Sequence, residues 1–395
     1  MPARGRGARA GRRLGPAPRR RCGRHVPEPR AHLPFAPSSP HRGGGRARGL
    51  SHRAAPGAGA HPRIRTKGGV ALAEPTPSSL PADRLVAAAS ADGSVRVTAL
   101  TLTHAVEEAR TAHATLPVAT AALGRAMAAG LLLAHALLKE PDRLTLRLLG
   151  DGPLGAVVVD ASPAGDVRGY VAQPRVMLPP TPAGKLDVGR AVGRRGVLHV
   201  SHDSGIGRPY TGSVPLVSGE VGEDVAHYLT TSLQVPSAVA VGVRVGTGGV
   251  VLGAAGVLVQ RLPGADEAAV ADVEAALSRL GPVSQVAAAG GTAQDLLAAA
   301  LAHLGHGAVA EVPLAWRCTC SRERTARLLA ALGAETLDGM IADDGGAELT
   351  CHFCGAVYRF DAAELKALGA ESNRSAGDDE GRPVHGPDGP APPEP

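Results

Sequence analysis

Cysteine and aromatic residues are scarce in this chain of 395 residues. Phe, Trp and Tyr together make up 2% of the sequence, so we expect a core built mostly from Ala, Val and Leu. Only five cysteines are present, which excludes a scaffold held together by many disulfides. Apolar residues still account for 44%, and the chain is long enough for two or three domains with a sizeable core.

Long uncharged apolar runs are also missing. The nearest approach, LPVATAALGRAMAAGLLLAHALL at 116–138, is interrupted by Arg125, so we interpret it as a buried helix rather than a membrane span. The N-terminus lacks the apolar segment of a secretory signal. We therefore expect a cytoplasmic protein whose thiols stay reduced, and there a cluster of cysteines indicates metal or redox chemistry.

Acidic residues are almost absent from the beginning of the chain. Residues 1–67 carry 17 of the 42 Lys and Arg residues and one acid, Glu28, whereas residues 68–395 carry 25 basic and 35 acidic residues, a net charge of −10. The basic pI of about 9.4 therefore does not indicate a nucleic-acid-binding body. Composition predicts a disordered Arg/Pro/Gly-rich extension over 1–79, which we interpret as an over-long start assignment; a polyanion-binding arm is the alternative.

The central part of the chain predicts an α+β core domain over 80–262, with a mixed sheet and helices. Helices are expected to begin at Thr103, as an N-cap residue, and to cover about 117–139 and 222–234, before Pro236. Strands are expected where apolar residues alternate or form short runs between Gly and Pro: 94–102, 143–150, 154–161, 165–172, 196–203, 237–245 and 249–262.

A helical linker is predicted over 263–312. Residues 266–281 and 292–305 have helical spacing but consist largely of Ala. Because replacing a buried Leu by Ala costs about 2–5 kcal/mol, we expect helices of this composition to be weakly anchored. A small module at 313–370 and a disordered acidic tail at 371–395 complete the predicted organisation.

Four of the five cysteines fall within one short window, as the pairs Cys318/Cys320 and Cys351/Cys354. The CTC and CHFC pairs flank a helical stretch and supply four thiolates, enough for a closed tetrahedral Zn²⁺ site. A module of this size has too little core to fold securely alone, so a metal would support its folding. His352 is interpreted as a surface residue, because four thiolates already fill the site. Half of the chain's aromatic residues lie beside the pairs: Trp316, Phe353, Tyr358 and Phe360.

The spacing also gives the site the properties of a redox switch. A structural zinc ion contributes about 10–16 kcal/mol to the folding of small modules. If adjacent cysteines were oxidised to each other, the loops closed would contain three or four residues and contribute only about 1.5–2 kcal/mol each. Oxidation should therefore unfold the module, and zinc-bound thiolates are already in the form that oxidants attack. An inert zinc module is the alternative.

CTCSRER at 318–324 and CHFCGAVYRF at 351–360 closely resemble the redox-regulated heat-shock protein 33 family, also called the 33 kDa chaperonin. The segments 165–171, 210–243 and 248–265 resemble that family's core domain, so the resemblance spans about 82–369. The N-terminal extension, which includes Cys22, has no counterpart in the family pattern.

The resemblance implies an ATP-independent holdase chaperone of the stress response. Reduced, it would be an inactive monomer holding one zinc ion through the four cysteines. Oxidation would form the disulfides Cys318–Cys320 and Cys351–Cys354, release zinc and unfold the linker. The activated protein would dimerise and bind unfolding client proteins through exposed apolar surface.

Two other classes of protein are weighed against this interpretation. A zinc-ribbon nucleic-acid-binding module could use Arg317, Arg322, Arg324 and Arg327 to meet phosphates. Six acids are interspersed between the same cysteine pairs, so we expect these arginines to form a solvated face or to contact the core domain.

An enzyme would need a recognisable catalytic arrangement. Ser201, His202 and Asp203 are adjacent and cannot form a relayed triad, and no G-x-S-x-G elbow is present. Gly246 and Gly248 begin a dinucleotide-type pattern that Val251 does not complete. His303 and His306 are expected to face solvent. We therefore predict that the protein is not an enzyme and binds neither nucleic acid specifically nor a membrane.

Overall fold

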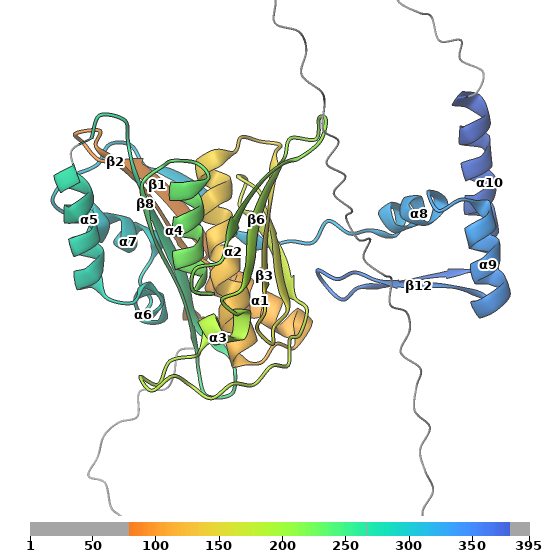
Figure 1. Ribbon diagram of the computed structural model, residues 1–395, viewed down its shortest axis with the longest axis horizontal. Helices are drawn as coiled ribbons and strands as arrows, with labels where there is room; N and C mark the ends of the chain where they lie inside the picture. Colours follow the sequence, from red (N-terminus) through yellow and green to blue (C-terminus); the bar gives the residue numbers. More distant parts are fainter. Residues whose placement is uncertain (1–78, 266, 380–395) are drawn as a thin grey trace, which may run out of the picture. The chain divides into compact units, whose positions relative to one another are not determined.

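The computed structural model describes residues 79–265 and 267–379, and its two sheets, helices and small C-terminal module confirm the predicted α+β class (Figure 1). Nearly all of the predicted extension over 1–79, with Cys22, and the end of the predicted tail, from residue 380, lie outside the described residues. The tail was expected to begin at Glu371, whereas the last helix continues to Asp379, since adding a residue to a formed helix is easier than starting one.

Two mainly antiparallel sheets form the core. The first has the order β10-β1-β2-β9-β8, and the second has the order β11-β5-β4-β3-β6-β7, with β11 parallel to β5. The strands of the first sheet are β1 Arg84–Ala89, β2 Val95–Thr101, β8 Ser237–Val245, β9 Val251–Arg261 and β10 Ala310–Pro313. Those of the second are β3 Arg143–Gly150, β4 Ala156–Ala161, β5 Asp166–Val171, β6 Gly196–Asp203, β7 Tyr210–Pro215 and β11 Ala315–Trp316.

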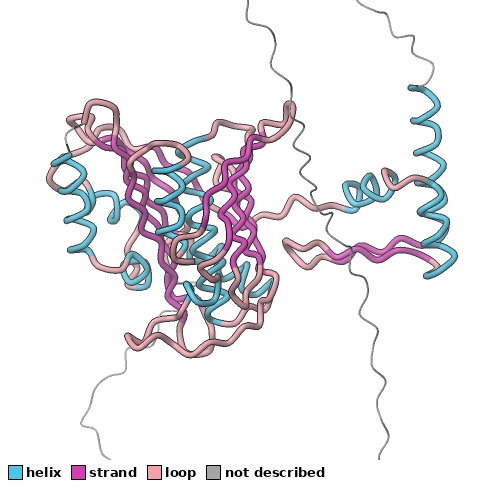
Figure 2. Tube along the Cα trace, viewed as in Figure 1, coloured by secondary structure: helices cyan, strands magenta, loops and turns pink. Residues whose placement is uncertain are grey.

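Helix α2 (Pro117–Leu137) lies between the two sheets (Figure 2). Most of its residues are buried, as expected for the apolar run over 116–138. Glycines let it approach both sides closely: a Cβ at Gly130 would lie 3.0 Å from Val159 of β4, and one at Gly256 of β9 would lie 3.0 Å from Leu132. An Ala-rich helix can therefore pack at short range and form the centre of the main hydrophobic core.

Three further helices belong to this core: α1 Thr103–His113, α3 Val188–Val192 and α4 Val221–Thr231. The prediction that Thr103 caps α1 is wrong. Leu102 is the N-cap residue, and the Thr103 hydroxyl accepts a hydrogen bond from the Ala254 amide. The carboxylate of Asp83 accepts hydrogen bonds from the first amides of the helix, at His104 and Ala105. A residue distant in sequence thus performs the capping role expected of a local one.

The linker helices pack on the outer face of the five-stranded sheet. They are α5 Glu267–Leu280, α6 Val283–Ala288 and α7 Ala293–Ala300. Val283, Leu296 and Leu297 are buried in a second hydrophobic cluster together with Val97 and Val257 of the sheet. The chain then returns to the same sheet, because β10 pairs with β1. The first sheet therefore includes a strand beyond residue 262, where the sequence suggested that the core ends.

The C-terminal module contains α8 Arg322–Ala330, α9 Ala334–Asp344, the hairpin of β12 Gly346–Thr350 and β13 Val357–Asp361, and α10 Ala362–Asp379. Among the side chains that the structure describes there, its hydrophobic cluster has four buried residues, Leu329, Leu337, Phe360 and Leu365. So small a core gives the module little stability of its own.

Candidate metal centre

The four cysteines of the C-terminal module lie in two short segments, which we call the first cysteine turn (318–320) and the second cysteine turn (351–354). Cys318 and Cys320 come just before α8, whose N-cap residue Ser321 accepts a hydrogen bond from the Arg324 amide. Cys351 and Cys354 lie in the turn between β12 and β13. There the Gly355 amide donates to the Cys351 carbonyl at 2.8 Å, and Gly355 has a φ of 72° that favours glycine.

The four sulfur atoms form one cluster in which all lie within 4.8 Å of one another. The Sγ atoms of Cys318 and Cys351 are 3.7 Å apart, and those of Cys320 and Cys354 are 3.3 Å apart. A tetrahedral zinc ion with bonds of about 2.3 Å places its sulfur ligands about 3.8 Å from one another. The two measured distances are close to this separation, so the cluster fits a four-thiolate metal site.

Hydrogen bonds make the four thiols unequal. Burial opposes ionisation of Cys318, but hydrogen bonds from the Cys320 amide and the neighbouring thiols outweigh it and lower the pKa of Cys318 from 9.0 to about 7. Burial raises the pKa of Cys351 and of Cys354. Tyr358 of β13 donates its hydroxyl to Cys320 Sγ at 3.1 Å, and this bond raises the pKa of Tyr358 to about 12. In the metal-free cluster Cys318 thus ionises before Cys351 and Cys354.

Residues of the core domain complete the surroundings of the cluster. Arg168 of β5 places its guanidinium 3.7 Å from Cys318 Sγ and 3.1 Å from Thr319 Oγ1. The same guanidinium lies over the ring of Phe353, 4.1 Å from its centroid. His113, at the end of α1, forms a hydrogen bond of 2.9 Å with the Phe353 carbonyl. Both cysteine turns therefore contact the core.

Sequence reasoning did not assign a role to Arg168, Tyr358 or His113. In the sequence, Arg168 belongs to the family-like segment 165–171, and Tyr358 is one of the four aromatic residues beside the cysteine pairs. The sequence does contain a usable signal for Tyr358. This residue follows Cys354 closely and lies two positions before Phe360 on the same short strand, so its hydroxyl could be expected near the cysteines. No local signal marks Arg168, which is 150 positions away from Cys318.

The other residues singled out in the sequence have structural positions. His352 is exposed and its ring lies against Tyr170 rather than in the sulfur cluster. Ser201, His202 and Asp203 lie along strand β6, where Ser201 pairs with Thr211 and His202 with Asp142. Gly246 and Gly248 lie in the turn between β8 and β9. His303 and His306 are exposed beyond the end of α7.

Two of the four arginines considered as phosphate contacts form ion pairs. Arg317 pairs with Asp166 of β5 at 3.5 Å. Arg322 pairs with Glu364 at 2.6 Å and lies over the Phe360 ring. Arg324 and Arg327 are exposed on α8. The expectation of a solvated face with some contact to the core is therefore confirmed for these side chains.

By length and composition alone, α2 is the one helix within residues 79–265 and 267–379 that could cross a membrane, and 89% of its apolar window is buried inside the protein. The helix is therefore accounted for by its position between the sheets.

The fold and the cluster together define a class of protein: an α+β domain of two sheets around a central helix, joined by packed linker helices to a four-thiol module. The sequence profile of the Hsp33 protein family matches residues 83–361, and the chain belongs to this family. The resemblance seen in the sequence is thereby confirmed.

Individual relatives are similar to this chain over most of their own length. The chain is 46% identical to the 33 kDa chaperonin of Desulforamulus reducens over 286 residues, which are 72% of this chain and 97% of the relative. It is 48% identical to that of Symbiobacterium thermophilum over 285 residues, 72% of this chain and 96% of the relative. The crystal structure of the 33 kDa chaperonin from Thermotoga maritima superposes with a TM-score of 0.68 at 34% identity, covering 74% of this chain and all of that one.

Proposed function

We propose that this protein is a redox-regulated, ATP-independent holdase chaperone, inactive when reduced and activated by oxidation of its four clustered cysteines. The observation that carries the proposal is the gathering of four thiols within 4.8 Å, in a member of the Hsp33 family. A cluster of that kind can hold a metal when reduced and can be oxidised without any other cofactor.

In the reduced state, Cys318, Cys320, Cys351 and Cys354 would hold one Zn²⁺ per chain. The metal would supply cross-links between two turns that are distant in sequence, since Cys318 and Cys351 are 33 residues apart and Cys320 and Cys354 are 34 apart. Tyr358 would donate a hydrogen bond to the thiolate of Cys320, and the Cys320 amide would donate to Cys318. Such donors stabilise thiolates and set their orientation.

Activation would convert four thiolates into the disulfides Cys318–Cys320 and Cys351–Cys354. The four sulfurs give up four electrons, which two molecules of hydrogen peroxide accept together with four protons to yield four molecules of water. Cys318, Cys320, Cys351 and Cys354 would then no longer hold Zn²⁺, since disulfide sulfurs are poor metal ligands. Sulfur contacts of 3.7 and 3.3 Å run across the two turns, from Cys318 to Cys351 and from Cys320 to Cys354, and the sulfurs would have to move to reach the disulfide bond length of about 2.05 Å.

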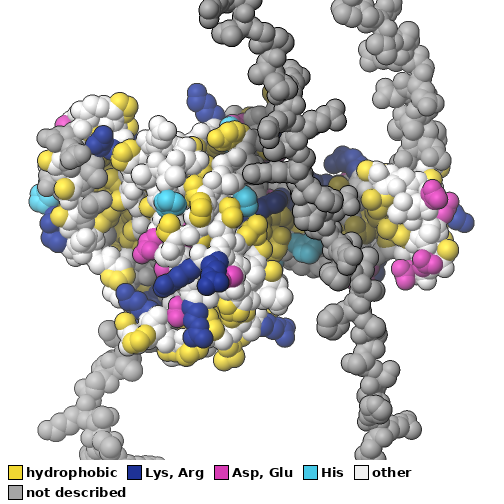
Figure 3. Space-filling model, viewed as in Figure 1, with side chains coloured by type: hydrophobic (Ala, Val, Ile, Leu, Met, Phe, Trp, Pro, Cys, Tyr) yellow, Lys and Arg dark blue, Asp and Glu magenta, His cyan; other side chains and the backbone are white. Residues whose placement is uncertain are grey.

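The surface proposed to hold clients is the outer face of the five-stranded sheet. Val86, Val97, Val257 and Val259 face the linker helices and are buried beneath them. On the described part of the face shown in Figure 3, hydrophobic side chains are dispersed among polar ones. Detachment of α6 and α7 would therefore expose the contiguous apolar surface that a holdase needs.

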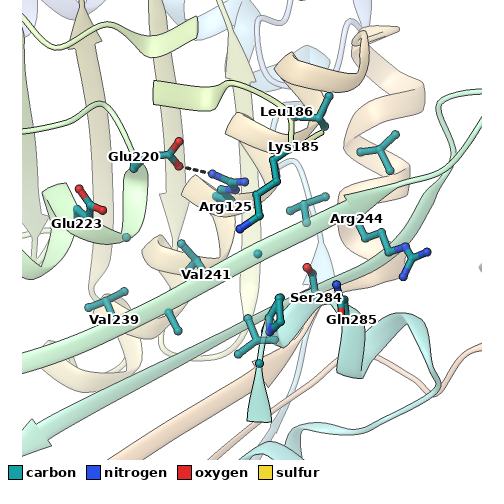
Figure 4. Close-up of a pocket in the computed structure, with 18 of the residues that line it drawn as sticks. Arg125, Lys185, Leu186, Glu220, Glu223, Val239, Val241, Arg244, Ser284 and Gln285 are labelled. Carbon is teal, nitrogen blue, oxygen red and sulfur yellow. Dashed lines mark hydrogen bonds and ion pairs between the residues drawn. The ribbon is translucent and has the colours of Figure 1, made fainter. Parts of the chain in front are cut away.

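The junction between α6 and the edge strand β8 is the place where detachment could start. A cleft of about 690 Å³ lies there, between Ser284 and Gln285 of α6 and Val239 and Val241 of β8 (Figure 4). These strand residues are only partly buried. Arg125 and Glu220, which form an ion pair, line the side of this cleft that lies away from α6. Ala238 and Ala240, the residues of β8 that belong to the linker-side cluster, are also only partly buried, so the linker does not fully cover this edge of the sheet.

The same proposal includes a cytoplasmic location, where reducing conditions keep the cluster metal-bound until oxidative stress, and dimerisation of the oxidised chain. Its partners would be unfolding proteins in general.

Zinc release and client aggregation, measured in one sample under peroxide at two temperatures, test the proposal. We expect one zinc ion per reduced chain, its release on oxidation, and suppression of aggregation of a thermally denatured client only after release. Unchanged client aggregation after complete zinc release would reject the chaperone function.

The alternative function is a zinc-ribbon nucleic-acid-binding protein, for which Arg324 and Arg327 remain exposed. A gel-shift titration at increasing salt, using a chain that begins at residue 79, distinguishes the two. Tight binding with a steep salt dependence would favour the alternative.

A further inference from the structure

Arg168 lies at the contact between the core domain and the sulfur cluster. On the core side, its Nε and Nη2 atoms donate to one carboxylate oxygen of Asp160, at 3.0 and 2.7 Å. Asp160 also accepts a hydrogen bond of 2.7 Å from Thr145. Both side chains of the ion pair are largely buried, 14% and 15% exposed. The guanidinium is therefore held in one orientation by the second sheet.

The opposite edge of the same guanidinium faces the module. Its Nη1 atom donates to Thr319 Oγ1 and contacts Cys318 Sγ, in the first cysteine turn. Its face covers Phe353, which lies between the two cysteines of the second turn. Tyr170, two positions along β5, packs edge-to-face on Phe353 with the ring centroids 5.2 Å apart. One core side chain thus contacts both turns.

Backbone contacts place the end of the linker beside this point. The Arg317 amide donates to the Val167 carbonyl at 2.9 Å, next to the pairing of β11 with β5. Strand β10, immediately before β11, pairs with β1. Any movement of Cys318 away from Arg168 therefore pulls on the segment that fastens the C-terminal end of the linker to both sheets.

Electrostatics makes the contact depend on the state of the cluster. Four thiolates around a divalent zinc ion carry a net charge of about −2, which attracts a guanidinium. Two disulfides carry no charge and accept hydrogen bonds weakly.

We propose that Arg168 is a positioning residue that docks the reduced metal centre on the core domain, so that loss of the metal releases β11, then β10 and the linker. The biological meaning of this inference rests on the proposed function. Its test does not require chaperone activity.

The test compares three full-length variants with the wild type. Arg168→Gln with Asp160→Asn removes the guanidinium without leaving an unpaired buried carboxylate. Arg168→Lys keeps the charge but cannot donate to Asp160 and Thr319 while covering Phe353. Arg147→Gln is the matched control, since Arg147 is an exposed arginine on strand β3 of the same sheet.

Three measurements are made on the reduced, zinc-loaded proteins: zinc affinity by competition with a chromophoric chelator, hydrogen exchange, and emission of Trp316, the single tryptophan of the chain. For the double variant we expect a zinc dissociation constant about 10- to 100-fold higher, with faster exchange over 310–320 and 351–355 and a shifted emission. Arg168→Lys should recover part of the affinity, and Arg147→Gln should match the wild type.

Unchanged exchange over α2 shows that the core of the double variant is intact. Wild-type zinc affinity and wild-type exchange over 310–320 in that variant would overturn the inference. If the wild type loses zinc on oxidation but fails to suppress aggregation, the proposed function fails while the Arg168 result still stands or falls on affinity and exchange. If the wild type is active after oxidation but the double variant has the same zinc affinity and hydrogen exchange as the wild type, this inference alone fails.

Discussion

A tyrosine hydroxyl and a guanidinium distinguish two of the four thiols. Cys320 accepts the Tyr358 hydrogen bond and Cys318 contacts Arg168. Both donors come from outside the cysteine turns, one from β13 and one from the core sheet. Donors of this kind fix a ligand's orientation and reduce the tendency of a thiolate to leave the metal. Removing them singly should therefore change metal affinity more than folding.

Tyr358→Phe removes one hydroxyl and keeps the ring that packs against the module's hydrophobic cluster. We expect the zinc dissociation constant to rise by up to about tenfold, because one hydrogen bond to a ligand is lost, with the secondary structure unchanged. Chelator competition measures the affinity. Tyr210→Phe on β7, where Tyr210 is 65% exposed, is the control. Equal affinities for the two variants would contradict a role of Tyr358 at the cluster.

Asp83 gives the core domain a pH-dependent stability. Burial outweighs its two amide hydrogen bonds and raises its pKa from 3.8 to about 6. The folded chain therefore binds this proton more tightly than the unfolded chain, so the stabilisation is complete below pH 3.8 and is lost as the pH rises through about 6. The shift corresponds to about 3 kcal/mol.

Comparison with Asp83→Asn isolates this effect. The free energy of unfolding of the variant minus that of the wild type should increase by about 3 kcal/mol between about pH 4 and about pH 7. Urea denaturation followed by far-ultraviolet circular dichroism measures both. A difference that does not vary with pH would contradict the raised pKa.

The linker helices show how an Ala-rich sequence can still be held on a sheet. Weak anchoring was expected because small side chains bury little area. The sheet compensates with glycines: a Cβ at Gly253 of β9 would lie 2.5 Å from the Ala288 backbone nitrogen, and one at Gly242 of β8 would lie 3.0 Å from Ser284. Helix α6 therefore packs almost directly on the backbone of the strands. The short distance between the helix and the strands compensates for the small side chains of the helix, so the linker is packed on the sheet in the reduced protein.

Gly253→Ala should loosen this contact. The added methyl group meets backbone atoms that cannot move aside cheaply, and overpacking of this kind costs about 1–3 kcal/mol. We expect faster hydrogen exchange in α6 and α7, and suppression of client aggregation at lower peroxide concentration. Gly339→Ala in α9, where an added Cβ meets nothing within 4 Å, serves as the control. If both variants exchange and activate like the wild type, α6 does not restrain activation.

At the scale of the whole molecule, the parts that sequence predicts are the local ones. Strands β3, β6 and β8 match their predicted ranges, because alternation of apolar residues is read within a few positions. The cysteine cluster was predicted from two short spacings. Three other features could not be predicted, because each joins residues that are distant in sequence and depends on the tertiary fold. They are the capping of α1 by Asp83, the pairing of β10 with β1 and the contact of Arg168 with Cys318.

Metal removal should divide the reduced molecule into two stability regions. The module's cluster contains four buried residues, Leu329, Leu337, Phe360 and Leu365, whereas α2 and both sheets share a continuous core. A metal bound by the four thiols would contribute about 10–16 kcal/mol, which would hold the module together but is not needed by the core. With a strong chelator and a reductant that prevents disulfides, we expect residues 317–369 to lose exchange protection while α2 and β3 keep theirs. Loss of protection should then spread into the linker from its C-terminal end, beginning at β11 and β10, which pair with the two sheets. Cys22→Ser should give the same result, since the metal is assigned to the four clustered thiols. A metal-free, reduced chain that keeps full protection over 317–369 would show that the module folds on its own, and that its cysteines do not make folding conditional on the metal.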